Sequence, residues 1–135
     1  MIMTAEPRKQ KGWYDRGYLP HFDGGEIVQF ITWRLCDSLP QKVLQRFNEE
    51  LSTRGAENLT RETLILVDEY LDKGIGSRHL RRRDVAEMVR DALLHHAGKM
   101  YILLAWVIMP NHVHLLLRPL AGKPLDKIIH SLKSF

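Results

Sequence analysis

Hydrophobic residues recur along most of the chain at spacings that distinguish strands from helices. Residues 26–35 (EIVQFITWRL) are rich in β-branched and aromatic side chains and follow the turn signal DGG, which predicts a strand. The segments after it place apolar side chains at positions i, i+3, i+4 and i+7, the pattern of amphipathic helices. Successive helices are predicted by the stripes Val43, Leu44, Phe47 and Leu51; Leu64, Val67, Tyr70 and Leu71; and Val85, Met88, Val89, Ala92 and Leu93.

Residues that favour helix ends bracket these stripes. Pro40 precedes the first stripe, and proline fits the first turn of a helix. The second helix is expected to begin at Thr60 and to end at Gly74, because glycine readily adopts the conformation that closes a helix. Asp84 begins a capping-box sequence for the third helix, and Gly98 follows its last apolar residue.

The apolar pattern changes in the last third of the chain. Residues 100–109 (MYILLAWVIM) and 112–119 (HVHLLLRP) are almost continuously apolar and are separated by Pro110 and Asn111, which predicts a hairpin of two strands. A final helix is predicted by the stripe Leu125, Ile128, Ile129 and Leu132. The expected order is strand, helix, helix, helix, strand, strand, helix, which is an α+β fold.

Length and composition limit the domain organisation. The chain has 135 residues, of which 44% are hydrophobic, enough for a single core. We therefore expect one domain over residues 1–135, with a basic and aromatic N-terminal arm at 1–24 and an α/β core at 25–135. The apolar stretch 101–117 is interrupted by Pro110, Asn111 and two histidines, and the N-terminus lacks the apolar centre of a signal peptide. A cytoplasmic protein without a membrane span is expected, and the single Cys36 fits a reducing compartment.

Positive charge is concentrated in two places. The net charge is +4, and basic residues alternate with aromatic ones in the N-terminal arm, while residues 78–83 form a second basic cluster. Cations that follow phosphates, together with rings that stack on unpaired bases, suit single-stranded nucleic acid. The alternative is a solvated arm and a charged loop without a ligand.

His112 and His114 are the strongest candidates for chemistry. In a strand their side chains point to the same face, about 6.8 Å apart along the backbone. Two neutral imidazoles suit Mg²⁺, Mn²⁺ or Zn²⁺ if an oxygen or nitrogen ligand joins them, and open positions on such an ion favour catalysis. His130 on the last helix could supply a third nitrogen, or could be a half-buried helix residue. A purely structural pair of histidines is the alternative.

Several phrases of the chain together resemble one protein family. AWVIMPNHVHLLLRP, followed by IIHSLKSF and preceded by WYDRGYLPHF and VQFITWRLCDSLP, is similar to the REP-associated tyrosine transposases. These are relatives of the small insertion-sequence transposases in the HUH endonuclease superfamily. The resemblance covers residues 13–135 and is specific, because the His-hydrophobic-His motif occurs with its preceding Met-Pro-Asn and its following apolar strand.

The resemblance implies a fold and an activity. The fold would be ferredoxin-like, an antiparallel sheet with helices on one face. His112 and His114 would be catalytic residues that hold Mg²⁺ or Mn²⁺ at the scissile phosphate of single-stranded DNA. A tyrosine would attack this phosphate at a hairpin, palindromic element, and strand transfer would follow through a 5′-phosphotyrosine intermediate. The residues expected to contact the DNA are Arg8, Lys9, Lys11, Trp13, Tyr14, Arg16, Tyr18, Arg81, Arg82 and Lys133.

The chain departs from the family at its end. The family's nucleophilic tyrosine lies on a helix downstream of the histidines, and this helix and the last strand of the sheet are absent from the sequence. We therefore expect a chain that is incomplete at its C-terminus and inactive by itself, or a non-catalytic remnant that binds hairpin DNA. Tyr70 and Tyr101 are interpreted as packing residues. Tyr14 and Tyr18 are candidate nucleophiles only by analogy with relaxases, which carry the tyrosine upstream.

The missing strand has a structural consequence. It would lie beside residues 28–35, so we expect the strand there to have one edge without a partner. A homodimer could form through this open edge.

Overall fold

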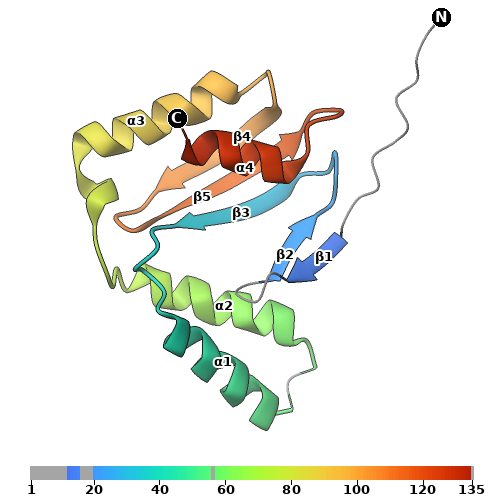
Figure 1. The fold of residues 1–135 in the computed structure, drawn as a ribbon, viewed down its shortest axis with the longest axis vertical. Helices are drawn as coiled ribbons and strands as arrows, with labels where there is room; N and C mark the ends of the chain where they lie inside the picture. The colour runs from blue at the N-terminus through green and yellow to red at the C-terminus, as the bar shows by residue number, and fades with distance from the viewer. Residues whose placement is uncertain (1–11, 16–19, 56, 135) are drawn as a thin grey trace, which may run out of the picture.

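The structure is a computed structural model, and it describes residues 12–15, 20–55 and 57–134. Its centre is a three-stranded antiparallel sheet with the order β3 (Gln29–Arg34), β5 (His112–Pro119) and β4 (Tyr101–Ile108). The helices are α1 (Gln41–Thr53), α2 (Leu59–Asp72), α3 (Arg83–His96) and α4 (Leu125–Lys133), with a short 3-10 helix η1 (His79–Arg81) before α3. The α+β class is confirmed, and the elements from β3 onward follow in the predicted order (Figure 1).

The central strand β5 separates two different surfaces of the sheet. Val113, Leu115 and Leu117 are fully buried on one face, where they form the main core with residues of α3 and α4. The intervening residues, which include His112 and His114, point to the other face because side chains alternate along a strand. The helices α3 and α4 cover the first face.

The helices α1 and α2 form a second, smaller core. Leu39, Leu44, Phe47, Val67 and Leu71 bury their side chains between these two helices. The C-terminal end of α2 lies against the face of the sheet that carries His112 and His114, here called the histidine face. Asn111, which precedes β5, holds this end in place by donating hydrogen bonds to its carbonyl oxygens. The helices are therefore not confined to one face, as the sequence analysis expected, because α2 approaches the face opposite to α3 and α4.

The turn between β4 and β5 is held from several sides. Met109 N donates to His112 O at 2.8 Å, which closes the hairpin predicted around Pro110 and Asn111. Leu80 N of η1 donates to Pro110 O at 3.2 Å, and Leu35 N, just after β3, donates to Asn111 O at 3.0 Å. These contacts bring η1 and the end of β3 to the residue that precedes the histidine strand.

The outer edges of the sheet have no strand partner within the described ranges. The strand β3 pairs with β5 from Gln29 to Arg34, and no other described strand pairs with it. This agrees with the open edge expected at residues 28–35. The strand β4 also pairs only with β5, and its register shifts between Leu103 and Ala105, which marks a β-bulge.

The N-terminal part contains a hairpin that the sequence did not predict. The strands β1 (Gly12–Asp15) and β2 (Pro20–Asp23) pair antiparallel in a separate two-stranded sheet (Figure 1). The sequence analysis placed a basic and aromatic arm at residues 1–24 and predicted no strand there, so this hairpin was missed. These strands are only four residues long, too short for a period of two to be recognised. None of the described helices has the length and apolar character needed to cross a membrane.

Candidate metal centre

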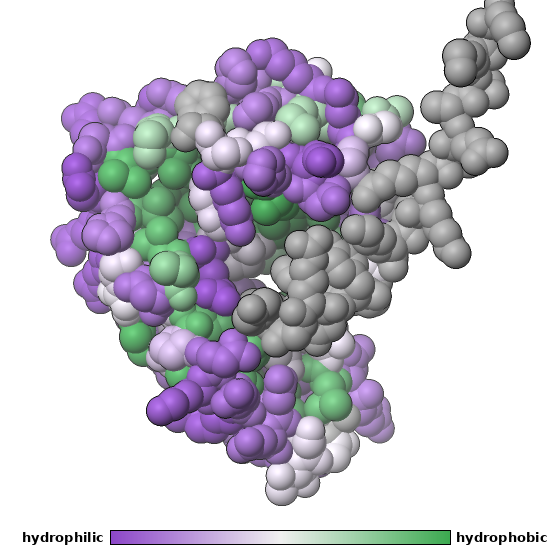
Figure 2. Space-filling view, viewed as in Figure 1, coloured by the Kyte–Doolittle hydropathy of each residue, from purple (hydrophilic) through white to green (hydrophobic). Residues whose placement is uncertain are grey.

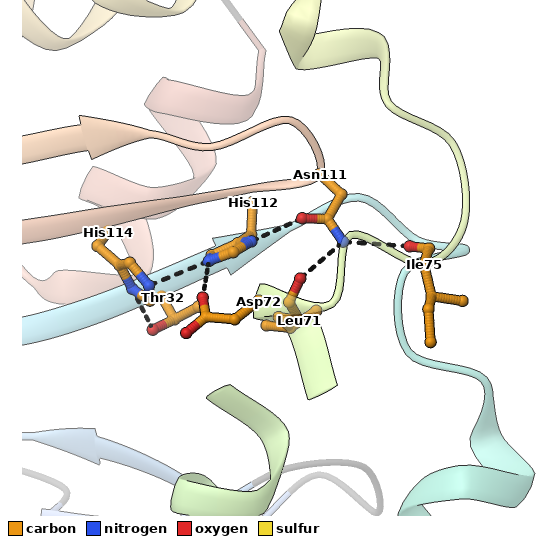
Figure 3. A network of polar contacts seen from close by, with 7 residues as sticks. All are labelled: Thr32, Leu71, Asp72, Ile75, Asn111, His112 and His114. Atoms are coloured by element: carbon orange, nitrogen blue, oxygen red, sulfur yellow. Dashed lines mark hydrogen bonds and ion pairs between the residues drawn. The ribbon is translucent and has the colours of Figure 1, made fainter. Parts of the chain in front are cut away.

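His112 and His114 lie side by side on the face of the sheet opposite the main core (Figure 3). Their Nε2 atoms are 3.1 Å apart, and the ring centroids are 4.6 Å apart at an interplanar angle of 80°. His112 is fully buried and His114 is half-buried. The strand alternation inferred from the sequence thus brings the two imidazoles together.

A carboxylate from another element joins the pair. Asp72 is the last residue of α2, and its Oδ1 lies 3.5 Å from His112 Nε2. One ligand atom each from Asp72, His112 and His114 lie within 4.8 Å of one another. The Asp72 side chain is 62% exposed, so this side of the group is open to solvent. In the sequence, the one feature that could have pointed to Asp72 is its position just before the predicted end of the second helix.

Asn111 fixes the orientation of His112. Asn111 Nδ2 donates to the backbone oxygens of Leu71 at 3.2 Å and Ile75 at 3.1 Å. Carbonyl oxygens only accept, so the Asn111 amide nitrogen must face them, and its oxygen then faces His112. His112 Nδ1 lies 2.7 Å from this oxygen and must carry the proton of the hydrogen bond. The lone pair of neutral His112 is therefore on Nε2, toward His114 and Asp72.

Burial keeps His112 neutral. Its pKa is lowered first by loss of hydration and then by His114, while Asp72 and Asp68 oppose the shift. A neutral imidazole with a free Nε2 is the form that binds a metal ion. The two chain neighbours Asn111 and His112 thus provide a ligand atom that is both aimed and unprotonated.

Thr32 orients the second imidazole. In the register of β3 and β5, Thr32 is directly opposite His114, and its Oγ1 lies 3.0 Å from His114 Nδ1. A hydroxyl can donate or accept a hydrogen bond, so Thr32 can form this bond with either neutral tautomer of His114. When His114 carries its proton on Nδ1, the Nε2 lone pair of this ring also faces Asp72 and His112.

Asp68 lies one helical turn before Asp72 and belongs to the same polar network. Burial raises the pKa of Asp68, whereas His114, His112 and a hydrogen bond from Thr32 lower it. The Thr32 hydroxyl therefore connects this carboxyl to His114. Such outer partners of a ligating histidine fix its ring and increase its basicity.

The donor set fits a divalent cation. Two imidazole nitrogens and one carboxylate oxygen can occupy one side of an ion, with the remaining positions left for substrate or water. The oxygen of Asp72 meets the requirement for a third ligand that the sequence left open. Between Mg²⁺ and Mn²⁺, the two nitrogen ligands favour Mn²⁺, because Mg²⁺ prefers an all-oxygen shell.

The structure does not bring His130 to this group. His130 is exposed on α4, and α4 packs through Ile128 and Leu132 on the face of Val113. The sheet therefore separates His130 from the histidine pair. The hypothesis that His130 supplies a third ligand was wrong, and the helix that supplies a carboxylate is α2.

The basic residues predicted to bind DNA fall in different places. Arg81 and Arg82 are exposed at η1 and the start of α3, beside the hairpin turn that precedes His112, and Arg82 pairs with Asp84 at 2.6 Å. Lys133 is on the surface at the end of α4, and its pKa is lowered first by partial burial and then by the charge of Arg34. Trp13 and Tyr14 belong to β1, and nothing is described of their side chains. Arg8, Lys9, Lys11, Arg16 and Tyr18 lie outside the described residues.

Tyr70 and Tyr101 have the packing roles expected of them. The buried Tyr101 hydroxyl donates to Leu93 O at 2.7 Å, and burial raises the pKa of Tyr101 to about 12. Tyr70 lies edge-on to Phe47, with ring centroids 6.0 Å apart, beside the core of α1 and α2.

One aromatic side chain, Phe30, lies against the histidine pair. Phe30 stacks on His114 with ring centroids 5.1 Å apart and an interplanar angle of 26°, and Phe30 is 60% exposed. The sequence analysis did not single out Phe30, Thr32 or Asn111, because their roles depend on the register of β3 with β5 and on the position of α2.

Comparison with known proteins gives no relative for this chain. No family model, no curated protein and no solved structure was found to match it.

Proposed function

We propose that this protein is a transposase-like, metal-dependent single-stranded DNA endonuclease of the HUH type, with its metal centre at His112, His114 and Asp72. The observation that carries the proposal is the convergence of two imidazole nitrogens and a carboxylate oxygen within 4.8 Å on an open face of the sheet. The resemblance of the histidine strand to REP-associated tyrosine transposases supports the same activity. The antiparallel order β3-β5-β4 supports a ferredoxin-like arrangement that lacks one edge strand.

The chain's own residues have distinct tasks in this proposal. His112 presents an unprotonated Nε2, His114 directs its own Nε2 to the same point, and Asn111 and Thr32 hold the two rings in place. Asp72 adds a negative charge on the solvent side. Bound Mg²⁺ or Mn²⁺ would polarise the scissile phosphodiester and offset the negative charge that develops on it during attack. A tyrosine hydroxyl would form the new phosphate ester while the 3′ oxygen leaves, which gives the 5′-phosphotyrosine link.

The surroundings suit an unpaired DNA strand. The exposed ring of Phe30, already stacked on His114, offers a surface for a base next to the scissile phosphate. Arg81 and Arg82 at η1 lie beside the turn that leads into the histidine strand, where they could contact the phosphates of a DNA hairpin.

A cleavage assay tests the proposal. Labelled hairpin DNA with an unpaired extension is incubated with the chain and Mn²⁺, and the products are examined for strand cleavage and for a covalent protein–DNA adduct that survives denaturation. The double variant His112→Ala/His114→Ala should lose both. The matched control is His95→Ala/His96→Ala, which removes two adjacent histidines from α3. Tyr14→Phe and Tyr18→Phe show whether either tyrosine carries the adduct.

A non-catalytic hairpin or single-stranded DNA-binding protein is the second candidate function. Tyr70 and Tyr101, the tyrosines whose side chains are described, both pack in cores and not beside the histidine pair. DNA binding that persists without an adduct in every condition would favour this second candidate. Equal Mn²⁺ affinity of the wild type and the double histidine variant would refute the metal centre itself.

A further inference from the structure

A groove lies along the outer edge of the sheet, away from the histidines. It encloses about 290 Å³ between α3 and β4, and its lining includes Arg83, Ala86, Glu87 and Arg90 of α3 and Trp106 of β4. In Figure 2, hydrophilic and hydrophobic residues lie side by side at the upper left, the region of α3 in Figure 1. The groove thus has one charged wall and one apolar wall.

Trp106 forms the apolar wall because of its place in the sheet. It is opposite Leu115 in the register of β4 and β5, so it points to the face that α3 and α4 cover. The strand β4 is the outermost strand on this side, and Trp106 remains 42% exposed. A partly exposed indole in a groove can stack against a flat ring.

The charged wall follows from the helical period. Residues 83, 86, 87 and 90 form a stripe on α3 next to the buried stripe of Val89, Ala92 and Leu93. Arg83 and Arg90 are seven residues apart, about 10 Å along the helix at 1.5 Å per residue. The small side chain of Ala86 between them leaves room above the groove.

Among the described residues, the ion pairs of both arginines are exposed. Arg83 contacts Glu87 at 3.0 Å, and Arg90 contacts Asp91 at 2.7 Å. Exposed pairs of this kind contribute little to stability, so both guanidinium groups can turn to a phosphate at small cost. Glu87 would then be free to accept hydrogen bonds from the amino or imino groups of a base.

We propose that this groove binds a single-stranded polynucleotide, with one base stacked on Trp106 and phosphates at Arg83 and Arg90. This surface is separate from the metal centre, because His112 and His114 point to the opposite face of the sheet. It would hold nucleotides that flank the cleaved or recognised element. The inference needs no metal ion, and it would hold for either candidate function.

An extended peptide could also occupy a groove between a helix and an edge strand. The strand β4 is a poor template for such an addition. Its register shifts between Leu103 and Ala105, next to Trp106, and a bulge interrupts the regular row of backbone donors and acceptors. The indole and the two guanidinium groups remain available to a base and to phosphates.

Binding of a fluorescent 12-nucleotide oligo-dT, measured by anisotropy in EDTA, tests the inference. Trp106→Ala should weaken binding about 5- to 100-fold, the usual range for loss of one stacked base, while Trp106→Phe should retain most of the affinity. Each of Arg83→Ala and Arg90→Ala should reduce the slope of log affinity against log salt by about 0.7. A matching oligo-U shows whether ribose is preferred.

Matched controls separate the groove from other effects. Arg54→Ala removes an exposed arginine that also pairs with a glutamate one turn away, and it should change neither the affinity nor the salt slope. His112→Ala/His114→Ala should lose Mn²⁺ binding, whereas Trp106→Ala should bind Mn²⁺ as the wild type does. Failure of the metal centre and failure of the groove are therefore distinguishable.

Two results would overturn the inference. One is that Trp106→Ala, shown to be folded by far-UV circular dichroism, binds oligo-dT as tightly as the wild type, and that Arg83→Ala has the same salt slope as the wild type. The other is binding of an oligo-glutamate peptide that equals oligo-dT in affinity and is lost in Trp106→Ala, which would make the groove a peptide site.

Discussion

His112 Nδ1 and Asn111 Oδ1 are 2.7 Å apart, and this bond between chain neighbours directs the free nitrogen of His112 away from the turn and toward Asp72. The same Asn111 amide donates to Leu71 O and Ile75 O at the end of α2. One buried side chain therefore orients a candidate ligand and attaches the helix that carries the carboxylate.

Asn111→Ala should be strongly destabilising. It leaves the oxygens of Leu71 and Ile75 without this donor and His112 Nδ1–H without its acceptor, at a cost of about 2–4 kcal/mol. Urea denaturation measures the loss. Asn48→Ala is the matched control, because Asn48 accepts one hydrogen bond from Thr63 near the surface and should cost below about 1 kcal/mol. Equal losses in the two variants would contradict the role given to Asn111.

Asp72→Asn should weaken Mn²⁺ binding by at least about 10-fold, because an amide oxygen replaces a charged ligand. Isothermal titration calorimetry of the folded variant measures this change. His130→Ala should bind Mn²⁺ as the wild type does, since His130 lies on the far side of the sheet. If His130→Ala lost affinity and Asp72→Asn did not, the proposed ligand set would be wrong.

Thr32→Val should lower Mn²⁺ affinity about 10-fold, because it removes the hydrogen-bond partner of His114 Nδ1. The free energy of unfolding should change by no more than about 1 kcal/mol, because valine keeps the shape of the side chain. Thr32→Ser retains the hydroxyl and should retain most of the affinity. Calorimetry with Mn²⁺ compares the three proteins. Indistinguishable affinities would show that the Thr32 hydroxyl does not position the ring.

The free energy of unfolding should fall as the pH falls below about 6.5. The folded-state pKa of His112 is lowered, so the unfolded chain, with a histidine pKa of about 6.5, takes up the proton first. The contribution of neutral His112 is thus complete above the unfolded pKa and is lost as the pH falls through the folded pKa, at up to about 1.4 kcal/mol per pH unit.

Urea denaturation of wild type and His112→Gln between pH 7.5 and 5.5 measures this dependence. Both proteins keep His96, whose pKa is also lowered by burial, so its contribution cancels in the comparison. The variant should show the shallower dependence. A parallel pH dependence in the two proteins would contradict a neutral, buried His112.

Tyr101→Phe should destabilise the protein by about 1 kcal/mol through loss of the hydrogen bond to Leu93 O, and it should leave any covalent adduct with DNA unchanged. Thermal unfolding and the hairpin cleavage assay measure the two effects. Loss of the adduct in a folded Tyr101→Phe protein would mean that this tyrosine reacts, against its buried position.

Much of the α/β core could be predicted from local patterns. The apolar stripe of Val85, Val89 and Leu93 was sufficient to predict α3, and the apolar runs around Pro110 were sufficient to predict the hairpin of β4 and β5. The hairpin of β1 and β2 was missed because four-residue strands show almost no period. In the candidate site, only the histidine pair could be predicted, since alternation along one strand is itself a local property.

The sequence by itself determined that two imidazoles share one face of a strand, because the geometry of β5 depends on the backbone of β5 alone. The tertiary structure decided which residues from elsewhere meet them. The packing of α2 against the histidine face brought Asp72 to the pair, the packing of α4 on the other face kept His130 away from it, and the register of β3 placed Thr32 and Phe30 beside His114. Contacts between distant segments depend on how whole elements pack, and no local period encodes this.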